Sequence, residues 1–435
     1  MSGAAAHAVD LREAVEMVLD EARTLGGCAL NVEQVGLLES AGRVLAEEIL
    51  ADRDQPPFDR ATRDGFAVRA EAWPAGKRLQ MVGQIRAGEG WSGAALASGE
   101  AVEIMTGAAI PEGADAVAML EHAKQSEGEV WAAAGRTLRA GENIVTRGSE
   151  ARRGDVLLTA GTTMGAAEIA LAAACGCAEA RVFARPAVAI VATGDELVEI
   201  GETPGPEQIR NSNGYALAAL VQATGGEARR LKIARDTREE LRIRIEEGRS
   251  CDLLLLSGGV SAGKYDLVEE VLAELGAEFF FTGVKMQPGR PAVFGRVQRV
   301  SGSAGQQVSE SPNRQGSEKA SEREWVYFFG LPGNPVSTEV TFHCFVGPML
   351  RAMCGAGVSG PKFVQATLGE EVRAKVGLTR LLPAKLTHDF KRPEVRLVGW
   401  QGSGDLAANA RANGYAVLPD GQELRAGDVI TVLLR

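Results

Sequence analysis

The sequence is poor in aromatic residues and in histidine, and it contains no long uninterrupted apolar run. Aromatic side chains make up 5% of the 435 residues, which argues against a protein that stacks nucleic-acid bases on exposed rings. The 4 histidines show no HExxH or comparable spacing, so zinc catalysis is not expected. No apolar run approaches the roughly 20 residues of a membrane span, and the N-terminus lacks the pattern of a signal peptide. We therefore expect a cytoplasmic protein without a membrane segment.

Cysteine is also scarce, with 6 scattered residues. In a long chain without a secretory signal, reduced thiols are expected rather than disulfides. Cys175 and Cys177 form a CxC pair, but no second pair follows, so ordinary thiols are favoured over a metal site there. The 47 basic and 57 acidic residues give a net charge of −10, which disfavours non-specific nucleic-acid binding. A local basic pocket for a small anion is compatible with this total.

Glycine, by contrast, is abundant, with 53 residues. Between Phe66 and Val145, short apolar runs alternate with glycine-rich turns, and this spacing predicts a small all-β domain. Helical patterns lie on both sides of it, at Leu11–Thr24 and Ala166–Ala174. The β region is therefore predicted to be an insertion between two helical pieces.

Residues 186–350 show a different pattern, in which buried strands alternate with helices. Ala187–Ala192 and Leu253–Leu256 are continuous apolar runs of the kind found in fully buried strands. Helices are expected at Asn213–Thr224, Asp236–Glu247, Leu267–Leu275 and Thr338–Leu350. This alternation predicts a mostly parallel sheet that is covered by helices on both faces.

Two segments depart from that alternation. Ser301–Glu324 is rich in Ser, Glu, Gly and Gln without any aromatic residue, so we expect a disordered insertion between strands Ala292–Val300 and Trp325–Phe329. The tail, Pro361–Arg435, again has short strands and turns, which predicts a small β domain at the end of the chain.

An acidic pair, Asp195 and Glu196, follows the first buried strand within Thr193–Leu197. Ligands of open α/β sheets bind at this carboxyl edge, where carboxylates can share Mg²⁺ with substrate phosphates. The other interpretation is a solvated turn with a helix-capping Asp, and these residues alone do not separate the two.

The second buried strand leads into the glycine-rich segment Ser257–Asp266. Its glycines let the backbone approach an anion, and the helix that follows supplies N–H groups. The segment lacks the Gly-Lys-Ser/Thr ending of a Walker A motif. Asp266 either caps the helix or contacts a metal, and a merely tight strand-to-helix turn is the alternative for the whole segment.

Two loops stiffened by proline complete the set of candidate ligand-binding segments. In the first, Lys285 and Arg290 lie close to two prolines and could bind phosphate or an oxyanion such as molybdate. In the second, Gly330–Ser337, two prolines enclose a Gly-Asn pair just before a helix, which is another position suited to anions. The alternatives are a plain surface turn and simple punctuation of a helix start.

Taken in order, these segments resemble the molybdopterin molybdenumtransferase (MoeA) family, which includes the E domain of gephyrin. The matching motifs are RDGFAV (63–68), IMTGA (104–108), GENI (141–144), RG (147–148), TGDEL (193–197), SGGVS (257–261), QPGRP (287–291) and LPGNPVS (331–337). The resemblance extends from about residue 10 to the C-terminus. Each motif is weak alone, but their order over the chain is specific.

The resemblance implies a multidomain α/β plus β fold. Its expected parts are an elongated helical N-terminal domain (1–52 and 146–184), an inserted β-rich domain (53–145), an αβα three-layer molybdopterin-binding domain (185–358, with the insertion 301–324) and a C-terminal β-barrel (359–435). It also implies an elongated homodimer, whose cleft lies between the αβα domain of one subunit and the β-rich domain of the other.

The activity implied by the resemblance is the last step of molybdenum cofactor biosynthesis. Molybdate is inserted into adenylylated molybdopterin and AMP is released, in a Mg²⁺-dependent reaction. The implied partners are small anionic substrates, a molybdopterin adenylyltransferase and apo-molybdoenzymes, with no nucleic acid and no membrane.

Functional residues are implied wherever this sequence matches the family's motifs. The implied catalytic residues are Asp64, Thr106, Asp236, Lys285 and Arg290, of which Asp64 and Thr106 would come from the partner subunit. The implied substrate-binding residues are Thr193, Gly194, Ser257, Gly258, Gly259, Ser261, Pro288, Gly289, Pro332, Gly333, Asn334, Pro335, Arg380 and Ser403. The implied metal ligands are Asp195, Glu196 and Asp266. Many relatives have lysine at the position of Arg290, where charge is kept but hydrogen-bond geometry differs.

Two other functions stay open at this point. The αβα domain alone resembles molybdopterin adenylyltransferases, which consume ATP and release pyrophosphate and usually have a single domain. A non-catalytic scaffold, like gephyrin at synapses, is the second alternative. The three additional domains favour the transferase, and no partner-binding module is visible apart from the insertion.

Overall fold

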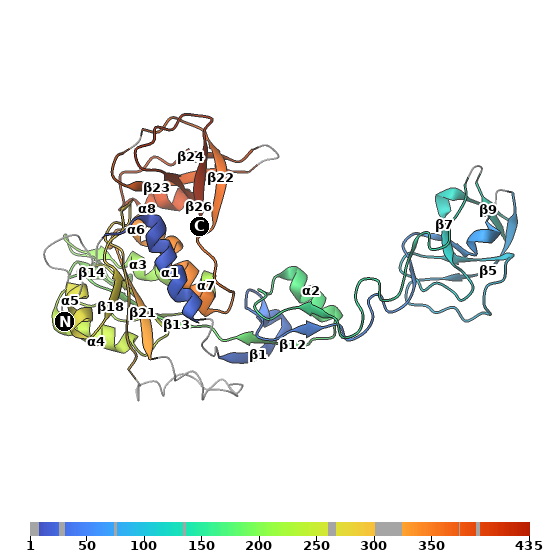
Figure 1. Cartoon of the computed structure of the whole chain (residues 1–435), viewed down its shortest axis with the longest axis horizontal. Helices are drawn as coiled ribbons and strands as arrows, with labels where there is room; N and C mark the ends of the chain where they lie inside the picture. The colour runs from blue at the N-terminus through green and yellow to red at the C-terminus, as the bar shows by residue number, and fades with distance from the viewer. Residues whose placement is uncertain are drawn as a thin grey trace. The chain divides into compact units, whose positions relative to one another are not determined.

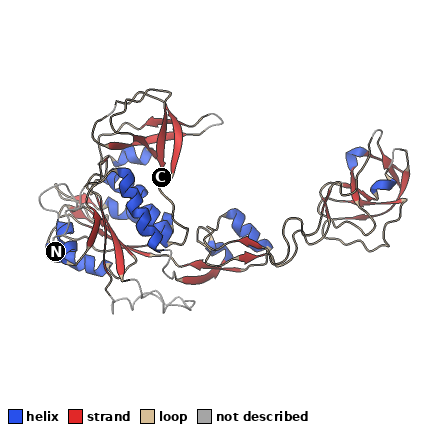
Figure 2. Cartoon of the chain, viewed as in Figure 1, coloured by secondary structure: helices blue, strands red, loops and turns tan. Residues whose placement is uncertain are grey.

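The computed structural model describes residues 8–25, 31–73, 76–133, 136–259, 267–300, 324–373, 375–388 and 392–435 (Figures 1 and 2). By contact, the chain forms two compact units. The first comprises Met1–Ala46, Gly161–Gly165 and Glu179–Arg435, and the second comprises Glu47–Ala160 and Ala166–Ala178. Except for Glu324, the predicted insertion 301–324 lies outside the described residues.

A six-stranded sheet forms the centre of the first unit, in the order β16-β13-β17-β21-β20-β18. The strands are β13 Ala187–Ala192, β16 Glu227–Arg230, β17 Leu253–Ser257, β18 Glu278–Phe281, β20 Val293–Gln298 and β21 Trp325–Leu331. The first four strands in that order are mutually parallel, and β20 runs antiparallel to both of its neighbours. The predicted mostly parallel sheet is therefore confirmed, with one antiparallel strand near its edge.

Helices cover both faces of this sheet, which confirms the αβα prediction. One face is covered by α1 Leu11–Leu25, α3 Ser212–Thr224, α6 Pro335–Thr341 and α7 Gly347–Met353, and the other by α4 Arg238–Gly248 and α5 Leu267–Glu274. Within β13, Val188 and Ile190 pack in the first core, whereas Ala189 and Val191 pack in the second. Successive side chains of a strand point to opposite faces, so a strand buried on both faces must be apolar throughout.

Two helix predictions need correction. The helix expected from Asp236 begins at Arg238, because Thr237 is its N-cap and accepts a hydrogen bond from the N–H of Glu240 (3.3 Å). The single helix expected at Thr338–Leu350 is divided into α6 and α7 by a π-helical turn, Phe342–Val346. Both departures are local and leave the topology unchanged.

A closed barrel forms the C-terminal part of the first unit, as predicted. Its strands are β22 Phe363–Leu368, β23 Thr379–Thr387, β24 Glu394–Leu397, β25 Gly414–Leu418 and β26 Val429–Leu434, and the helix α8 Leu406–Arg411 precedes β25. The order is β23-β24-β22-β26-β25, and β25 pairs with β23 to close the barrel. A short strand, β19 Met286–Gln287, pairs in parallel with β23 and so joins the barrel to the αβα layers.

Smaller elements complete the first unit. They are the antiparallel pair β1 Val32–Gly36 and β12 Glu179–Phe183, the 3-10 turn η1 Leu37–Ser40, and the parallel pair β14 Leu197–Val198 and β15 Ile209–Arg210. By contact, α1 belongs to this unit, although it lies in the predicted N-terminal domain.

The second unit contains the predicted β-rich insertion. Its sheet has the order β7-β4-β6-β5-β9-β8. The strands are β4 Gly65–Val68, β5 Arg78–Ile85, β6 Glu100–Ile104, β7 Ala116–Met119, β8 Ala123–Ser126 and β9 Glu129–Ala132. Two short ladders, β2 Ile49–Leu50 with β11 Val156–Leu158 and β3 Arg60–Ala61 with β10 Ile144–Val145, and the helix α2 Ala166–Ala174 lie outside that sheet.

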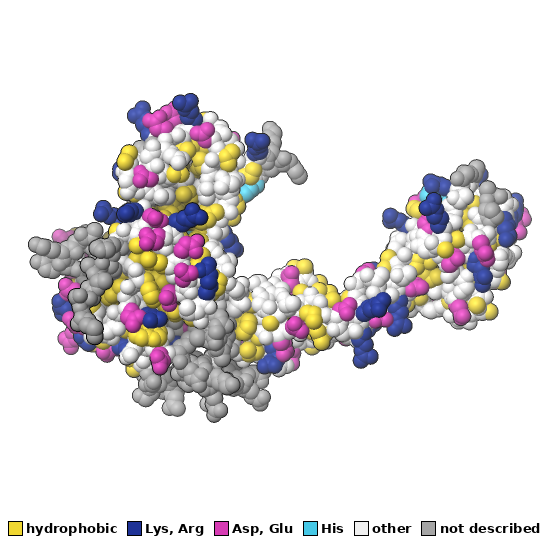
Figure 3. All heavy atoms as spheres, in the orientation of Figure 1, with side chains coloured by type: hydrophobic (Ala, Val, Ile, Leu, Met, Phe, Trp, Pro, Cys, Tyr) yellow, Lys and Arg dark blue, Asp and Glu magenta, His cyan; other side chains and the backbone are white. Residues whose placement is uncertain are grey.

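No helix within the described ranges is both long and apolar enough to cross a membrane. On the face drawn in Figure 3, acidic and basic side chains are interspersed on both units. Such mixing keeps the electrostatic field of either sign local.

Candidate active site

Three neighbouring parallel strands end at the same level and deliver three of the sequence motifs to one edge of the sheet. Ala192 of β13 is in register with Ser257 of β17, which is in register with Leu331 of β21. The segments that follow these residues therefore emerge side by side, at the carboxyl edge where ligands of open α/β sheets bind.

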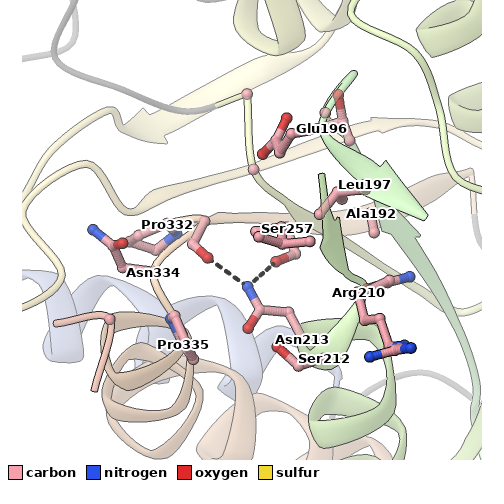
Figure 4. Close-up of a pocket in the computed structure, with 18 of the residues that line it drawn as sticks. Ala192, Glu196, Leu197, Arg210, Ser212, Asn213, Ser257, Pro332, Asn334 and Pro335 are labelled. Atoms are coloured by element: carbon pink, nitrogen blue, oxygen red, sulfur yellow. Dashed lines mark hydrogen bonds between the residues drawn. The ribbon is translucent and has the colours of Figure 1, made fainter. Parts of the chain in front are cut away.

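A cavity of about 940 Å³ lies at this edge (Figure 4). It is lined by eleven of the predicted residues, which come from all three motifs and from the start of α4. These are Thr193, Gly194, Glu196, Asp236, Ser257, Gly258, Gly259, Pro332, Gly333, Asn334 and Pro335. The remaining wall comes from Ala192, Leu197, Pro204, Gln208 and Pro291, from β15 and the start of α3, and from Gly404 and Leu406 in the C-terminal part of the unit.

Glycine is required where the chain passes between two of these segments. Gly258 has φ +96°, and a Cβ there would lie 2.4 Å from the carbonyl oxygen of Thr193. Gly259 has φ +65°, and its Cβ would lie 2.7 Å from a methyl group of Val268. A side chain at Gly258 would collide with the segment after β13, and one at Gly259 would collide with α5, so both glycines are needed for the close packing beside the cavity.

The acidic residues in and beside the first cavity take different roles. The Thr193 hydroxyl donates to Oδ1 of Asp236 (2.7 Å), and Glu196 also lines the cavity. Asp195 is not among the lining residues, and its Oδ1 accepts the backbone N–H of Asp236 (3.3 Å). Its carbonyl oxygen accepts from Nη1 of Arg235 (2.8 Å), so Asp195 holds the start of the α4 segment in place.

Among the described residues, no group of three or more His, Cys, Asp and Glu side chains could hold a metal by itself. Mg²⁺ commonly binds through one or two carboxylates together with substrate phosphates. Glu196 and Asp236 fit that pattern, because both present carboxylates to the same cavity. The predicted ligand Asp266 and the predicted substrate contact Ser261 lie outside the described residues.

A second cavity, of about 360 Å³, shares Pro291, Pro332 and Asn334 with the first. Four more predicted residues line it, namely Pro288, Gly289, Arg290 and Ser403. Ser337, Trp400, Met286, Gln287 and Gly402 complete its wall, so its polar side chains are one guanidinium, two hydroxyls, an indole N–H and the amides of Gln287 and Asn334. This set is suited to an oxyanion.

Two buried polar atoms near the second cavity have no hydrogen-bond partner within the described part of the chain. They are Oε1 of Gln287 and Nε of Arg380, which belong to residues paired in register between β19 and β23. Predicted Lys285 precedes this strand but lines neither cavity, and its backbone bonds to Val9 and Thr379. A buried guanidinium N–H without an acceptor costs free energy that a bound anion would recover.

The second unit brings together the other two predicted catalytic residues. Both the backbone N–H and the hydroxyl of Thr106 donate to Oδ1 of Asp64, each at 2.7 Å. These two hydrogen bonds, the backbone one first, hold the pKa of the Asp64 carboxyl below its usual value. Both residues are exposed, so the pair presents a carboxylate to solvent on the surface of this unit.

Several lining residues were missed by the sequence reasoning. Asn213, on the first turn of α3, donates to both Ser257 and the carbonyl of Gly333, and Ser337 and Trp400 line the second cavity. The run Asn211-Ser212-Asn213 at the start of an apolar helix was the available signal, because such residues are typical of helix starts. Nothing local distinguishes a capping residue from one that faces a ligand.

Comparison with known proteins matches the whole chain to one family. Three family models match in order: MoeA N-terminal region (domain I and II) at residues 9–176, probable molybdopterin binding domain at 189–352, and MoeA C-terminal region (domain IV) at 365–434. Curated relatives named molybdopterin molybdenumtransferase include one from Staphylococcus epidermidis, 31% identical over 98% of this chain and 95% of the relative. Another, from Staphylococcus aureus strain MRSA252, is 32% identical over the same shares.

The fold agrees with solved structures as well. A molybdopterin biosynthesis MoeA protein from Pyrococcus horikoshii OT3 superposes with a TM-score of 0.73 at 27% identity, over 99% of this chain and 100% of that one. A second structure, titled as the MoeA protein of "Pyrococcus horikosii", gives a TM-score of 0.71 at 31% identity, over 98% and 99%. The motifs, the architecture and these matches together show that this chain is an enzyme of the molybdopterin molybdenumtransferase (MoeA) family.

Proposed function

We propose that this enzyme inserts molybdate into adenylylated molybdopterin and releases AMP, with Mg²⁺ bound against the substrate's phosphate. The observation that carries the proposal is the pair of cavities that share Pro332 and Asn334. One presents carboxylates and glycine-rich backbone, and the other presents Arg290 and hydroxyl groups. A phosphate-bearing organic substrate and a small oxyanion therefore have separate, adjoining places.

The first cavity suits the adenylylated substrate. Its volume of about 940 Å³ accommodates a large ligand, and ligand sites commonly range from about 300 to 1,000 Å³. Glu196 and Asp236 would hold Mg²⁺, which neutralises phosphate charge as the AMP leaves. The hydroxyl of Thr193 fixes one oxygen of Asp236 by hydrogen bonding, which leaves the other carboxylate oxygen for the metal.

The second cavity suits molybdate. The Arg290 guanidinium supplies positive charge, the hydroxyls of Ser337 and Ser403 supply donors, and the buried Nε of Arg380 lacks an acceptor nearby. Because the wall between the cavities is made of two rigid proline-containing segments, a bound oxyanion would be held close to the organic substrate. Holding two reactants together in this way lowers the entropic part of the barrier.

We further propose that the enzyme works as a homodimer in the cytoplasm and exchanges molybdopterin intermediates with a molybdopterin adenylyltransferase and apo-molybdoenzymes. The carboxylate of Asp64 with its partner Thr106 supports an additional contribution to the site from the β-rich unit. In the dimer this contribution would come from the neighbouring subunit.

The decisive experiment mixes the pure protein with adenylylated molybdopterin, molybdate and Mg²⁺ and follows AMP release and molybdenum cofactor formation. Release of AMP that depends on both molybdate and Mg²⁺ supports the proposal. An adenylyltransferase would instead consume ATP and release pyrophosphate from unmodified molybdopterin. A scaffold would show neither reaction.

A further inference from the structure

Asn213 connects two of the three segments that line the first cavity. Its side-chain amide nitrogen lies 3.0 Å from the hydroxyl oxygen of Ser257 and 2.7 Å from the carbonyl oxygen of Gly333. Figure 4 shows both contacts as dashed lines that meet at Asn213, which is one of the residues that line the cavity. The residue thereby ties the end of β17 to the proline-containing segment that precedes α6.

The direction of these two hydrogen bonds follows from their chemistry. A carbonyl oxygen only accepts, so the Asn213 atom next to the Gly333 oxygen must be the amide nitrogen. An amide nitrogen only donates, so Ser257 must accept at its hydroxyl oxygen. The assignment of the amide orientation therefore rests on Gly333 and does not depend on where hydrogens are placed.

The consequence for Ser257 is that its own O–H proton stays available. The residue is 3% exposed, lines the cavity and has no hydrogen-bond acceptor for that proton within the described part of the chain. A buried hydroxyl that leaves its proton unpaired is costly, and an oxygen atom of a bound ligand removes that cost. Asn213 thus prepares Ser257 as a donor.

The consequence for the Gly333 segment is that its backbone is held from two sides. The hydroxyl of Thr338, on α6, lies within hydrogen-bond distance of the carbonyl oxygens of Pro332 (2.6 Å) and Asn334 (3.0 Å), which share its single proton. The carbonyl between them belongs to Gly333, and Asn213 satisfies it from outside that helix. Helix α3 provides a firm base for Asn213, because Leu217 and Val221 of the same helix are fully buried in the core.

From this arrangement we propose that Asn213 is a positioning residue, which aims the Ser257 hydroxyl at a phosphate oxygen of the substrate and keeps the Gly333 segment at the cavity wall. The role rests on the proposed function, because adenylylated molybdopterin is the ligand that supplies this phosphate. Asn213 itself acts through Ser257 and Gly333 and needs no contact with reacting atoms.

Two substitutions separate this role from simple support of the fold. Asn213→Ala removes both hydrogen bonds, and we expect kcat/KM for adenylylated molybdopterin to fall by about tenfold. Asn213→Asp has nearly the same shape, but its carboxylate repels the Gly333 carbonyl and draws the Ser257 proton toward itself. We expect kcat/KM of Asn213→Asp to fall by about a hundredfold. Most of this loss should come from a raised KM, with a raised dissociation constant for the substrate.

A double-mutant cycle and a pH series sharpen the test. In a Ser257→Ala background, the Asp at position 213 has no hydroxyl proton to attract. The loss of kcat/KM in the double variant, expressed as free energy, should therefore be smaller than the sum of the losses in the two single variants. As the pH falls, the introduced carboxyl is protonated and can donate to Gly333. The ratio of Asn213→Asp to wild-type activity should therefore rise toward acid pH.

The matched control is Asn413 in the barrel, whose side chain also makes two hydrogen bonds. It accepts from the N–H of Leu386 (2.7 Å) and donates to the carbonyl of Leu386 (2.8 Å), and it lines neither cavity. Asn413→Ala should lower the melting temperature and leave the substrate's KM and dissociation constant unchanged.

The outcomes also separate the inference from the proposed function. If wild-type protein binds adenylylated molybdopterin in a calorimeter but releases no AMP, the proposed reaction is wrong, and the dissociation constants of the variants still decide the role of Asn213. Equal losses for Asn213→Ala and Asn213→Asp, or strictly additive effects with Ser257→Ala, would overturn the inference. Absence of wild-type binding would overturn both.

Discussion

At the scale of single residues, the two cavities differ in the charge that they present. Arg290 is the only charged residue that lines the second cavity within the described residues, whereas the first cavity is lined by two carboxylates, of Glu196 and Asp236, and by one guanidinium, of Arg210. The stiff segment around Arg290 limits the number of conformations that must be frozen when an anion binds. Its charge should therefore determine how tightly the oxyanion is held.

We expect Arg290→Gln to raise the KM for molybdate by about ten- to a hundredfold, because a hydrogen bond to a charged group is lost. Arg290→Lys should raise it less, since the charge stays while the forked geometry is lost. Steady-state kinetics at varied molybdate measure both. Arg249→Gln is the control, because this guanidinium donates to the carbonyl of Gln298 and lines neither cavity. An unchanged molybdate KM in Arg290→Gln would contradict the assignment of the second cavity.

At the scale of elements, the turn after β17 depends on a backbone conformation that glycine alone adopts easily. Gly258 combines a positive φ with a near contact to the backbone of Thr193, and the adjoining Gly333 would place a Cβ 3.6 Å from the Gly258 Cα. The constraint at position 258 therefore comes from its positive φ and from the backbone of Thr193, whereas the contact with Gly333 is of ordinary length. Substitution of Gly258 affects the fold and the cavity together.

We expect Gly258→Ala to lower the free energy of unfolding by about 3 kcal/mol, the sum of left-handed strain and a backbone collision that must be relieved. Urea denaturation measures this loss, and AMP release should fall with it. Gly276→Ala provides the comparison, because Gly276 has φ +79° with nothing within 4 Å of its Cβ position. Left-handed strain alone should lower the free energy of unfolding of Gly276→Ala by about 1 kcal/mol, and AMP release should stay unchanged. Equal losses of unfolding free energy in Gly258→Ala and Gly276→Ala would show that the backbone near Thr193 can move away from the new side chain without a further loss of stability.

At the scale of the whole molecule, a buried polar cluster joins the αβα layers to the barrel within the first unit. Glu339 of α6, 8% exposed, pairs with Nε of Arg435 at 2.5 Å and accepts from Nδ2 of Asn409 at 2.6 Å. The hydroxyl of Tyr415 donates to Oδ1 of the same asparagine (2.9 Å), and the imidazole of His343 lies 3.6 Å from Glu339. Because α6 follows the Gly333 segment and Val336 bonds to the carbonyl of Ser403 (3.0 Å), this cluster supports both cavities.

We expect Glu339→Gln to destabilise the protein by about 2 kcal/mol, because it removes the buried negative charge that pairs with Arg435, although that guanidinium still donates to the carbonyls of Asn409 and Ala412. Burial alone would raise the pKa of the Glu339 carboxyl, but His343, Arg435 and Asn409 outweigh it and hold that pKa below the usual 4.5. A lowered pKa in the folded state means that the ion pair stabilises at pH above about 4.5 and that this contribution disappears as the pH falls further.

Melting temperatures measured from neutral to acid pH check both statements. The difference in melting temperature between wild type and Glu339→Gln should be largest at neutral pH. It should become smaller as the pH falls below the usual pKa of a glutamate carboxyl. The control is Glu129→Gln, which breaks the surface pair of Glu129 with Arg78, whose side chains are 38% and 56% exposed. The melting temperature of Glu129→Gln should differ little from that of wild type. A difference between wild type and Glu339→Gln that grows toward acid pH would contradict the role of Glu339.

The proposed homodimer leads to a complementation test. Asp64 belongs to one compact unit and Glu196 to the other, and the shared-cleft proposal requires that they meet between subunits. Asp64→Asn and Glu196→Gln proteins should each fail to release AMP. Mixed dimers should recover a fraction of the wild-type rate, because one of their two sites keeps both native carboxylates. Mixed dimers that form, as shown by affinity tags on each variant, and remain inactive would contradict the shared cleft.

Much of the molecule follows from local sequence patterns. Continuous apolar runs such as Ala187–Ala192 identify strands buried on both faces, and amphipathic runs such as Leu11–Thr24 identify helices, because burial on a face depends on side-chain spacing along the chain. The glycine- and proline-rich motifs likewise identify the segments that line the cavities, since both residue types act on their own backbone. Together with the order of the motifs, these patterns were sufficient for the family and the fold.

The tertiary structure alone decided which of those segments meet. The strand order β13-β17-β21 places Ala192, Ser257 and Leu331 in register, and this order depends on pairing between residues far apart in sequence. The same long-range packing gives two adjacent residues different roles. Asp195 accepts a hydrogen bond from the backbone N–H of Asp236, just before α4, and Glu196 lines the cavity. It also brings Asn213, a polar residue at a helix start, within hydrogen-bond distance of both Ser257 and Gly333. Local patterns specify conformation, but contacts between distant segments are set by packing energies that no short stretch of sequence contains.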